Sequence, residues 1–380
     1  MQSEDKIFDF IIIGAGIAGA SVAAYLAPEA EICLVEAESQ AGYHATGRSA
    51  AMYVPAYGPP AIRKLTRASG DFFHNPPEGF SDTSLLSPRD ILLVGTKEQS
   101  GSFDEFKKTI KSASNMVPIS ANGLQDYQPL LRDGYGAQGL LDPTGSDIDV
   151  DALHRGFLRQ ATQNGAEVKT NHIITSMMYE NGVWHLNHKQ GVIKAKAIIN
   201  AAGAWAEEIG RMAGAEHISL TPKRRTALII SADPSLDLLN MPMTIDIDEA
   251  FYLKPEAGQI LISPANEDPM APCDAQADEM DIAICIDRIE RAFNLNIRRI
   301  ESKWAGLRSF VPDKEPVVGY SEMAEGFFWL AGQGGYGIQT SPAMGRMAAA
   351  LALGKRIPDD IQQQGLAEDS LLAARLQRSV

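Results

Sequence analysis

The N-terminal segment restricts the possible architectures more than any other part of the chain. An apolar run at 7–13 predicts a buried strand, and the small residues at 20–26 predict a helix. Between them lies the glycine turn GAGIAG at 14–19, and a second apolar run at 31–35 ends in Glu36. Strand, G-x-G-x-x-G turn, helix, strand and acid in this order are typical of a βαβ unit that binds a dinucleotide.

Each part of this motif has a physical role in holding a pyrophosphate. Gly14 permits the tight turn, Gly16 lets the backbone approach the phosphates, and Gly19 lets the helix pack closely on the strand. The helix N-terminus offers free N–H groups to the anion, and Glu36 can accept hydrogen bonds from ribose hydroxyls. The expected cofactor contacts in this segment are Gly14, Gly16, Ile17, Ala18, Gly19 and Glu36. A structural glycine turn that binds nothing is the alternative.

Two further segments with glycines lie far along the chain. The strand predicted at 197–205 ends in small residues, which can lie against a nucleotide that the first motif already holds. The strand predicted at 327–331 enters the glycine-rich segment 332–340, where a helix begins. A flavin that gains an electron pair accumulates negative charge near N1 and the C2 carbonyl, and a helix N-terminus stabilises such charge. These segments favour FAD over the shorter NAD; an ordinary glycine-rich turn is the alternative.

The chain length and the order of the predicted elements indicate two interleaved domains. Strands predicted at 225–231, 250–253 and 259–262 suggest an antiparallel sheet, and a helix is predicted at 279–293. We expect an α/β fold in which a Rossmann-type FAD-binding domain is interleaved with an antiparallel-sheet α+β substrate domain. We expect the tail from Ala373 to fray. The FAD-binding domain takes residues 1–80, 145–215 and 312–380, and the substrate-binding domain takes 81–144 and 216–311.

The composition argues against several classes of function. The formal net charge of −14 disfavours nucleic acid or an anionic membrane as a partner. Three cysteines without a C-x-x-C pair, and histidines without ligand spacing, predict no metal site, no disulfide framework and a reducing, cytoplasmic compartment. Asp149 and Asp151 are better explained as candidate helix N-caps than as calcium ligands. We expect no signal peptide and no transmembrane segment, since the apolar runs are short.

The glycine motifs, in the order in which they occur, resemble the FAD-dependent D-amino acid oxidase superfamily, which includes glycine and sarcosine oxidases. Further segments are similar to bacterial D-arginine dehydrogenases, and the match covers nearly the whole chain. These segments are residues 42–51, 86–89, 222–225, 251–255, 304–310 and 333–340. The additional cofactor contacts that we expect are Gly47, Arg48, Ser49, Ala50, Ile174, Ala202, Gly203, Trp205, Gly306, Gly335, Tyr336, Gly337, Ile338 and Gln339.

The resemblance implies a flavin enzyme that oxidises D-amino acids by hydride transfer to flavin N5. The product is an imino acid, which hydrolyses to a 2-oxo acid and ammonia. Arg225 and Arg308 match two arginines that clamp the substrate carboxylate, and Tyr252 matches a tyrosine that adds a hydrogen bond. The backbone carbonyl of Gly335 is expected to orient the amine, and Tyr57 matches a mobile-loop tyrosine over the pocket. Structural ion pairing is the alternative for the two arginines.

Three pocket positions depart from the arginine-selective pattern, and all three lose a polar group. Ile91 stands where those enzymes carry a glutamate for the guanidinium, Met52 replaces a histidine and Val54 replaces a threonine. Asp90 is adjacent to Ile91, but one step along a strand reverses the direction in which the side chain points. Because burying a guanidinium without a partner costs several kcal/mol, we expect apolar or aromatic D-amino acids as substrates rather than D-arginine.

Other functions stay open at the level of the residues. The same arginines would serve a glycine- or sarcosine-type amine oxidase that uses O2, or a flavin dehydrogenase acting on a 2-hydroxy acid or glycerol phosphate. A non-catalytic nucleotide-binding protein is a further alternative, which the glycine-rich segment before Ile338 disfavours. The electron acceptor and the oligomeric state are left open. Non-covalent flavin is expected, because no cysteine lies in the flavin-facing motifs.

Overall fold

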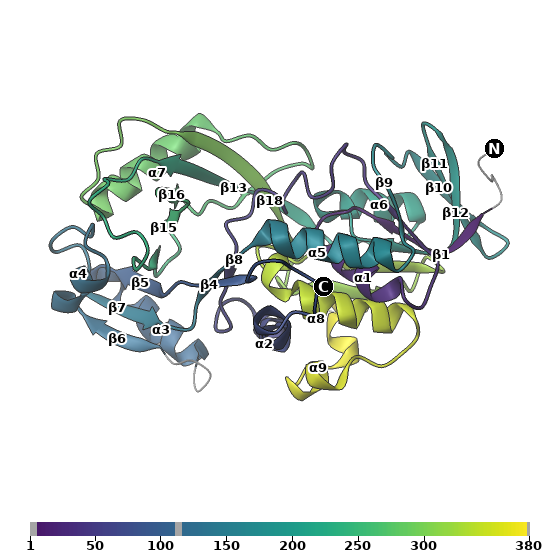
Figure 1. Cartoon of the computed structure of the whole chain (residues 1–380), viewed down its shortest axis with the longest axis horizontal. Helices are drawn as coiled ribbons and strands as arrows, with labels where there is room; N and C mark the ends of the chain where they lie inside the picture. The colour runs from purple at the N-terminus through teal and green to yellow at the C-terminus, as the bar shows by residue number, and fades with distance from the viewer. Residues whose placement is uncertain (1–5, 111–115, 378–380) are drawn as a thin grey trace.

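The fold is built on an eight-stranded sheet and a nine-stranded sheet, counted over the described part of the chain. Figure 1 shows a computed structural model of the protein, which describes residues 6–110 and 116–377. In this view the eight-stranded sheet and its helices lie on the right, and the nine-stranded sheet lies on the left. The predicted α/β fold with a second, strand-rich part is confirmed.

The first sheet has a parallel centre formed around the N-terminal strand. Its order is β10-β11-β12-β1-β2-β9, and β20 pairs with the second half of β12 and carries β19. Because β1 runs parallel to both β12 and β2, the carboxyl ends of these strands meet at one edge. The strands are β1 (Ile7–Ile13), β2 (Ile32–Val35), β9 (Glu167–Lys169), β10 (Ser176–Glu180), β11 (Val183–His188), β12 (Gly191–Asn200), β19 (Val317–Tyr320) and β20 (Phe327–Ala331).

Three helices pack together beside this sheet, with α1 in contact with both α5 and α8 (Figure 1). α1 is buried on nearly all sides, as expected for an apolar helix that lies between a sheet and other helices. Gly345 of α8 permits the close approach, since a Cβ there would lie 2.8 Å from the Cβ of Ser21. The helices are α1 (Ile17–Leu26), α5 (Val150–Gln163) and α8 (Gly337–Ala352). A further helix, α6 (Ala206–Ala213), shares a buried apolar cluster with Ile11 and Ile198 of the sheet.

The second sheet follows the order β17-β13-β16-β15-β14-β5-β7-β6, with β18 on the other side of β13. The predicted antiparallel arrangement is right for every pair of these described strands except β5 and β14, which run parallel. The strands are β5 (Ile91–Gly95), β6 (Val117–Ser120), β7 (Gln138–Asp142), β13 (Thr221–Ile230), β14 (Met243–Asp246), β15 (Tyr252–Glu256), β16 (Gln259–Ser263), β17 (Asp268–Pro269) and β18 (Ser302–Phe310).

Alternation along its strands gives the second sheet two different faces. Leu92, Leu228 and Leu253 are buried on the face that packs against helix α7 (Glu279–Ala292). Ile91 and Tyr252 belong to the opposite face, where they form a separate apolar cluster with Val54 and other residues. The second face is therefore the one that meets the N-terminal loops.

A small three-stranded sheet joins the two large ones. It consists of β3 (Met52–Tyr53), β8 (Ser146–Ile148) and β4 (Leu86–Pro88). Asp147 of β8 accepts hydrogen bonds from Lys254 Nζ at 2.6 Å and from Arg89 Nε at 2.9 Å. Asp149, two residues later, caps α5 by accepting from the backbone N–H of Ala152 at 2.9 Å, as predicted.

The boundaries of several elements differ from the sequence expectations. The strand expected at 197–205 is the end of β12, and the chain turns at Gly203–Trp205 into a 3₁₀ helix. The sequence also predicts a charged surface helix over 103–112; the structure has α3 (Ser100–Ile110), and positions 111 and 112 lie outside the described residues. A tail expected to fray from Ala373 is packed over its described residues 373–377, since Ala373 is buried and Arg375 pairs with Asp313 at 2.8 Å.

The strands of the first sheet all come from the segments 1–80, 145–215 and 312–380, and those of the second sheet from 81–144 and 216–311. We propose these segments as the two interleaved domains. None of the helices in the described ranges has the length and apolar character needed to cross a bilayer. The remaining helices are α2 (Pro60–His74), α4 (Leu124–Tyr127), α9 (Asp359–Gln363) and α10 (Ala374–Gln377).

A comparison of two glycines with similar backbone angles distinguishes the effect of steric crowding from that of backbone strain. Gly14 has φ +100° and a Cβ there would lie 2.5 Å from the carbonyl oxygen of Ala201, whereas Gly165 has φ +92° and open space around it. We expect Gly14→Ala to lower the free energy of unfolding by about 1–3 kcal/mol more than Gly165→Ala, because of overpacking. Urea unfolding of both variants measures this difference. Equal losses would contradict the crowding argument.

Candidate active site

A cavity of about 650 Å³ lies between the first sheet and the second sheet. The structure describes all of the expected catalytic, cofactor and substrate residues. All of them line this cavity except Gly19 and Gly47. A Cβ at Gly19 would overlap the carbonyl oxygen of Gly14, so Gly19 permits the packing of α1 on β1. Gly47 closes a turn in which its N–H donates to the carbonyl of Gly42 at 2.8 Å. These two glycines shape the site without facing it.

The first glycine turn is held by the acid that follows β2. Glu36 is buried; its Oε2 accepts from the N–H of Ala15 at 2.8 Å, and its Oε1 accepts from the N–H of Glu38 at 3.0 Å. A carboxylate can accept about four hydrogen bonds. Glu36 therefore fixes the turn and retains acceptor capacity on the cavity side for ribose hydroxyls.

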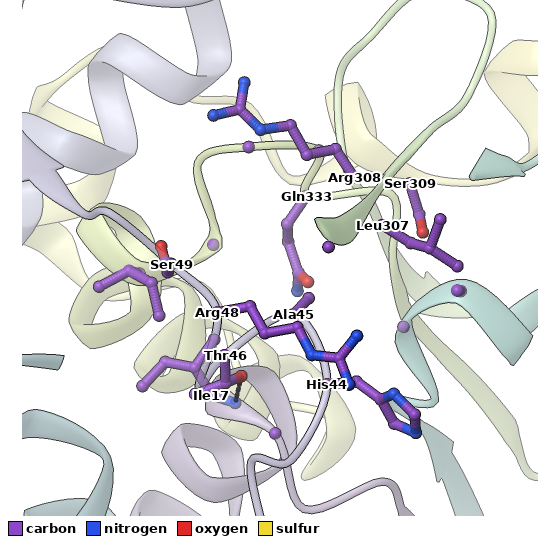
Figure 2. Close-up of a pocket in the computed structure, with 18 of the residues that line it drawn as sticks. Ile17, His44, Ala45, Thr46, Arg48, Ser49, Leu307, Arg308, Ser309 and Gln333 are labelled. Carbon is purple, nitrogen blue, oxygen red and sulfur yellow. Dashed lines mark hydrogen bonds between the residues drawn. The ribbon is translucent and has the colours of Figure 1, made fainter. Parts of the chain in front are cut away.

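The loop formed by residues 42–50 is fastened to the N-terminus of α1. Thr46 Oγ1 accepts from the N–H of Ile17 at 3.0 Å, and Figure 2 shows the two residues side by side. His154 of α5 donates from Nε2 to the carbonyl of Ala15 at 2.9 Å. Sequence reasoning missed both residues as parts of the site: Thr46 stands inside a motif that was recognised, whereas His154 had no local signal.

Arg48 connects the same loop to the second sheet. Its Nη1 donates to the carbonyl oxygens of Ala275 at 2.9 Å and Ala305 at 3.0 Å, and its Nη2 pairs with Asp274. The indole N–H of Trp304 donates to the carbonyl of Arg48 at 3.0 Å. The Arg48 side chain lines the cavity, but its guanidinium is already engaged by the protein.

The register of β13 and β18 places the two expected carboxylate-binding arginines on one face. Arg225 is opposite Gly306, and Arg308 is opposite Lys223, two residues along β13. Cross-strand partners and residues two apart share a face, so both guanidinium groups emerge on the cavity side. Figure 2 shows Arg308 extending away from the side chains of Leu307 and Ser309.

The buried guanidinium of Arg225 is held by the backbone and by an acid. Its Nε donates to the carbonyl of Asn266 at 2.8 Å, and its Nη2 donates to Glu267 at 3.3 Å. Burial lowers the pKa of Arg225 from its ordinary value, and the nearby positive charge of Arg308 lowers it further. Because Arg225 is desolvated and has a positive neighbour in Arg308, an anion bound beside the two guanidinium groups would offset both effects.

Gly335 fits closely against Arg308. A Cβ at this position would lie 2.8 Å from Cζ and 2.9 Å from Nε of Arg308, so only glycine leaves the guanidinium where it stands. The adjacent Gly334 donates its N–H to the carbonyl of Ser309 at 2.9 Å. The glycine-rich segment before α8 therefore packs directly on the strand that carries Arg308.

Tyr57 and Glu249 meet at the cavity from different loops. The hydroxyl of Tyr57 donates to Glu249 Oε1 at 2.8 Å, and its ring contacts the ring of Tyr336 at 5.5 Å between centroids. Burial, followed by the negative charge of Glu249, raises the pKa of Tyr57 well above its ordinary value. No local pattern indicates Glu249, which takes a left-handed backbone conformation, φ +56°, in the turn between β14 and β15.

The substrate side of the cavity is largely apolar. Val54, Ile91, Met243 and Tyr252 form one cluster with all four side chains buried, and Met52 packs against it. Ile91 lines the cavity and its neighbour Asp90 does not, in line with the alternation along β5. Met243 lies opposite Ile91 in the parallel β5–β14 pair, a contact that the sequence did not indicate.

The start of α8 offers unused donors to the cavity. α8 begins after Tyr336 without a side-chain cap from the described residues, so its first N–H groups lack partners inside the helix. Gln339 Oε1 accepts from the N–H of Val54 at 3.0 Å, whereas its buried Nε2 donates to no described residue. Donors of this kind suit the electron-rich edge of a flavin, so the residues present fit FAD.

The chain belongs to the FAD dependent oxidoreductase family, whose model matches residues 9–351. FAD is its cofactor, and the expected superfamily is confirmed.

Two curated relatives match most of this chain. Mitochondrial dimethylglycine dehydrogenase from Mus musculus is 27% identical over 92% of this chain, and the match spans only 43% of that longer protein. Glycine oxidase from Bacillus licheniformis is 24% identical, covering 93% of this chain and 95% of that protein.

Solved structures support the fold at lower identity. L-proline dehydrogenase from P. horikoshii superposes with a TM-score of 0.80 at 21% identity, covering 98% of both chains. Glycine oxidase from Geobacillus kaustophilus gives 0.79 at 19% identity, covering 92% of this chain and 95% of the other. Among the described residues, no group of three or more His, Cys, Asp or Glu is placed to hold a metal ion.

His154 makes stability depend on pH. Burial is the main cause that lowers its pKa, against the raising effects of Ala15, Asp151 and Glu36. The folded protein thus favours neutral histidine, and the unfolded chain binds more protons below about pH 6.5. The stability contributed by His154 is complete above that pH and is lost as pH falls through the lowered pKa.

We therefore expect the difference in free energy of unfolding between the wild type and His154→Gln to shrink as pH falls from about 7 to 5. Denaturant unfolding at each pH measures it, with His217→Gln, at an exposed histidine, as the control. A difference that stays constant over this range would contradict the buried, neutral state of His154.

Proposed function

We propose that the protein oxidises amino acids of D configuration with apolar side chains to imino acids, which water then hydrolyses to 2-oxo acids and ammonia. The observation that carries this proposal is the placement of two arginines, Arg225 and Arg308, on one face of the second sheet beside an apolar wall. An amino acid has the matching pattern of an anionic group next to a side chain.

Arg225 and Arg308 anchor the carboxylate in this proposal. Each charge-assisted hydrogen bond contributes roughly 1.5–3 kcal/mol, and two of them fix the direction of the substrate Cα–H. The hydroxyl of Tyr252 adds a third contact, and the carbonyl of Gly335 orients the amine. FAD supplies the acceptor for the hydride at N5.

Tyr57 is a poor candidate for the base that takes a proton from the amine. Because its pKa is raised well above its ordinary value, the phenol stays protonated near neutral pH and donates to Glu249. The substrate then binds with its amine already neutral, and kcat/KM should rise with pH toward the pKa of the amine itself. A lower pKa that is the same for every substrate would contradict this.

Apolar side chains fit the pocket better than a guanidinium does. Met52, Val54 and Ile91 offer no acceptor to a buried cation. Burying a cation without a partner costs several kcal/mol. We therefore propose that D-arginine is a poor substrate.

Oxidation of glycine or of an N-methylated glycine is the second candidate. It is supported by the names of the relatives, dimethylglycine dehydrogenase and glycine oxidase, and by arginines that could hold the carboxylate of either substrate. This candidate leaves the apolar wall without a partner, because glycine and its N-methyl derivatives have no side chain to place there.

The test is a substrate panel on the purified yellow protein with a dye acceptor, run aerobically and anaerobically. It includes D-methionine, D-leucine, D-phenylalanine, D-arginine, the L-enantiomers, glycine, sarcosine, dimethylglycine and a 2-hydroxy acid. The apolar D-amino acids should have the highest kcat/KM. A clear lead for D-arginine, an L-amino acid or an N-methylglycine would contradict the proposal.

Removing one carboxylate anchor should weaken substrate binding far more than removing a neighbouring cation. We expect Arg308→Met to lower kcat/KM about 10- to 150-fold, the equivalent of one charge-assisted bond. Lys303→Met is the matched control, since Lys303 stands on the same strand and pairs with Glu279 at an exposed site. Similar losses in both variants would argue against a substrate role for Arg308.

Gly335→Ala tests the contact between the glycine-rich segment and Arg308. The added Cβ must displace the guanidinium, so KM for D-amino acids should rise at least about 10-fold while FAD stays bound. Benzoate, a carboxylate without an amine, should also bind more weakly when followed by the flavin spectrum. Unchanged benzoate affinity would contradict the displacement.

We extend the proposal to a cytoplasmic location. All three cysteines, which lie within the described ranges, are free thiols, and Cys33 and Cys285 are buried. Fractionation of the native cells tests this location. Detection of the protein outside the cytoplasmic fraction would contradict it.

A further inference from the structure

The cavity face of the second sheet changes from polar to apolar across its width. At one side, β13 and β18 present Arg225 and Arg308. At the other side, the parallel register pairs Met243 with Ile91 and Ile245 with Leu93. Positions two apart on a strand share a face, so the last four residues form a continuous apolar surface.

The cavity continues beyond the residues expected to hold a substrate side chain. Past Ile91 and Met243 it is lined by Leu93 and Ile245, and it reaches Phe106 of α3 and Met116 before β6. Leu93 is buried, whereas Phe106 and Met116 are half-buried, so the extension runs toward the protein surface beside α3.

The distance across the sheet from β15 to β5 is longer than the side chain of a short amino acid. Tyr252 lies on β15, and β14 and β5 are the next two strands across the sheet. Two strand spacings amount to roughly 10 Å. Ile91 stands at the start of β5; Leu93 lies two residues further along β5, and Ile245 lies two residues beyond Met243 on β14.

We propose that this extension accepts a long, unbranched apolar side chain, with Leu93, Ile245, Phe106 and Met116 as the residues that determine chain length. The inference rests on the proposed function, because it assigns the substrate carboxylate to Arg225 and Arg308 and lays the side chain across β14 and β5.

Physical chemistry favours an alkyl group over water in the extension. Protein interiors are normally packed to the density of organic crystals, and an open apolar space lowers stability. The four lining side chains offer no hydrogen-bond partners that would hold an ordered water. Burying one methylene group favours binding about fourfold, so each added carbon should increase affinity until the extension is filled.

The experiment uses linear, unbranched D-2-amino acids from D-alanine to D-2-aminooctanoate on the holoenzyme. We expect kcat/KM to rise about fourfold per methylene beyond D-norvaline. Ile245→Phe narrows the extension and should flatten this rise, whereas Ile245→Ala widens it and should favour the longest members. Ile247→Phe is the matched control, because Ile247 packs in the same cluster without lining the cavity.

Saturated fatty acids from butanoate to octanoate give a readout that needs no turnover. Their affinity, followed by the flavin spectrum, should rise with length in the wild type and less steeply in Ile245→Phe. A maximum of kcat/KM at D-norvaline and of affinity at butanoate would overturn the inference while short D-amino acids remain substrates. The same length dependence in Ile245→Phe as in the wild type would also overturn it. If no D-amino acid is oxidised but fatty acids still show the length dependence, the proposed function fails and the apolar extension stands.

Discussion

The pairing of β13 with β18 is the constraint on which the proposed chemistry of this protein depends. It puts Arg225 opposite Gly306 and brings Arg308 to the same face, and a slip of one residue in this pairing would put the two arginines on opposite faces of the sheet. Asn266, between β16 and β17, holds the other edge of β13, since its side chain accepts from the N–H of Thr226 while its backbone carbonyl accepts from Arg225. The position of two charges thus follows from backbone pairing.

The FAD-binding part and the second sheet are joined by specific hydrogen bonds as well as by apolar packing. Arg48 connects the loop after β2 to β18, and Asp147 connects the small sheet to Lys254 and Arg89. These contacts fix the cofactor loop relative to the strands that carry the candidate substrate residues. Orientation of a substrate against a cofactor requires this kind of rigidity, because misplacement by about 1 Å can cost a large factor in rate.

The sequence predicts local features well and distant pairings poorly. The turn at Gly14 and the cap at Asp149 follow from short motifs whose physics is contained in a few neighbouring residues. Resemblance supplied Arg225 and Arg308, since no spacing rule relates arginines so far apart. Met243, Ile245, Glu249, Thr46 and His154 were missed because their roles arise from the β5–β14 register, a left-handed turn and contacts between segments distant in the chain. The parallel β5–β14 pair escaped prediction for the same reason.

A crystal structure of the FAD-bound protein with a linear carboxylate such as hexanoate would show directly whether the two arginines act together. We predict carboxylate oxygens within hydrogen-bond distance of both Arg225 and Arg308, with the alkyl group lying against Ile91 and Met243. A carboxylate bound elsewhere, with Arg225 still held only by Asn266 and Glu267, would contradict the conclusion that the two arginines form one anion site.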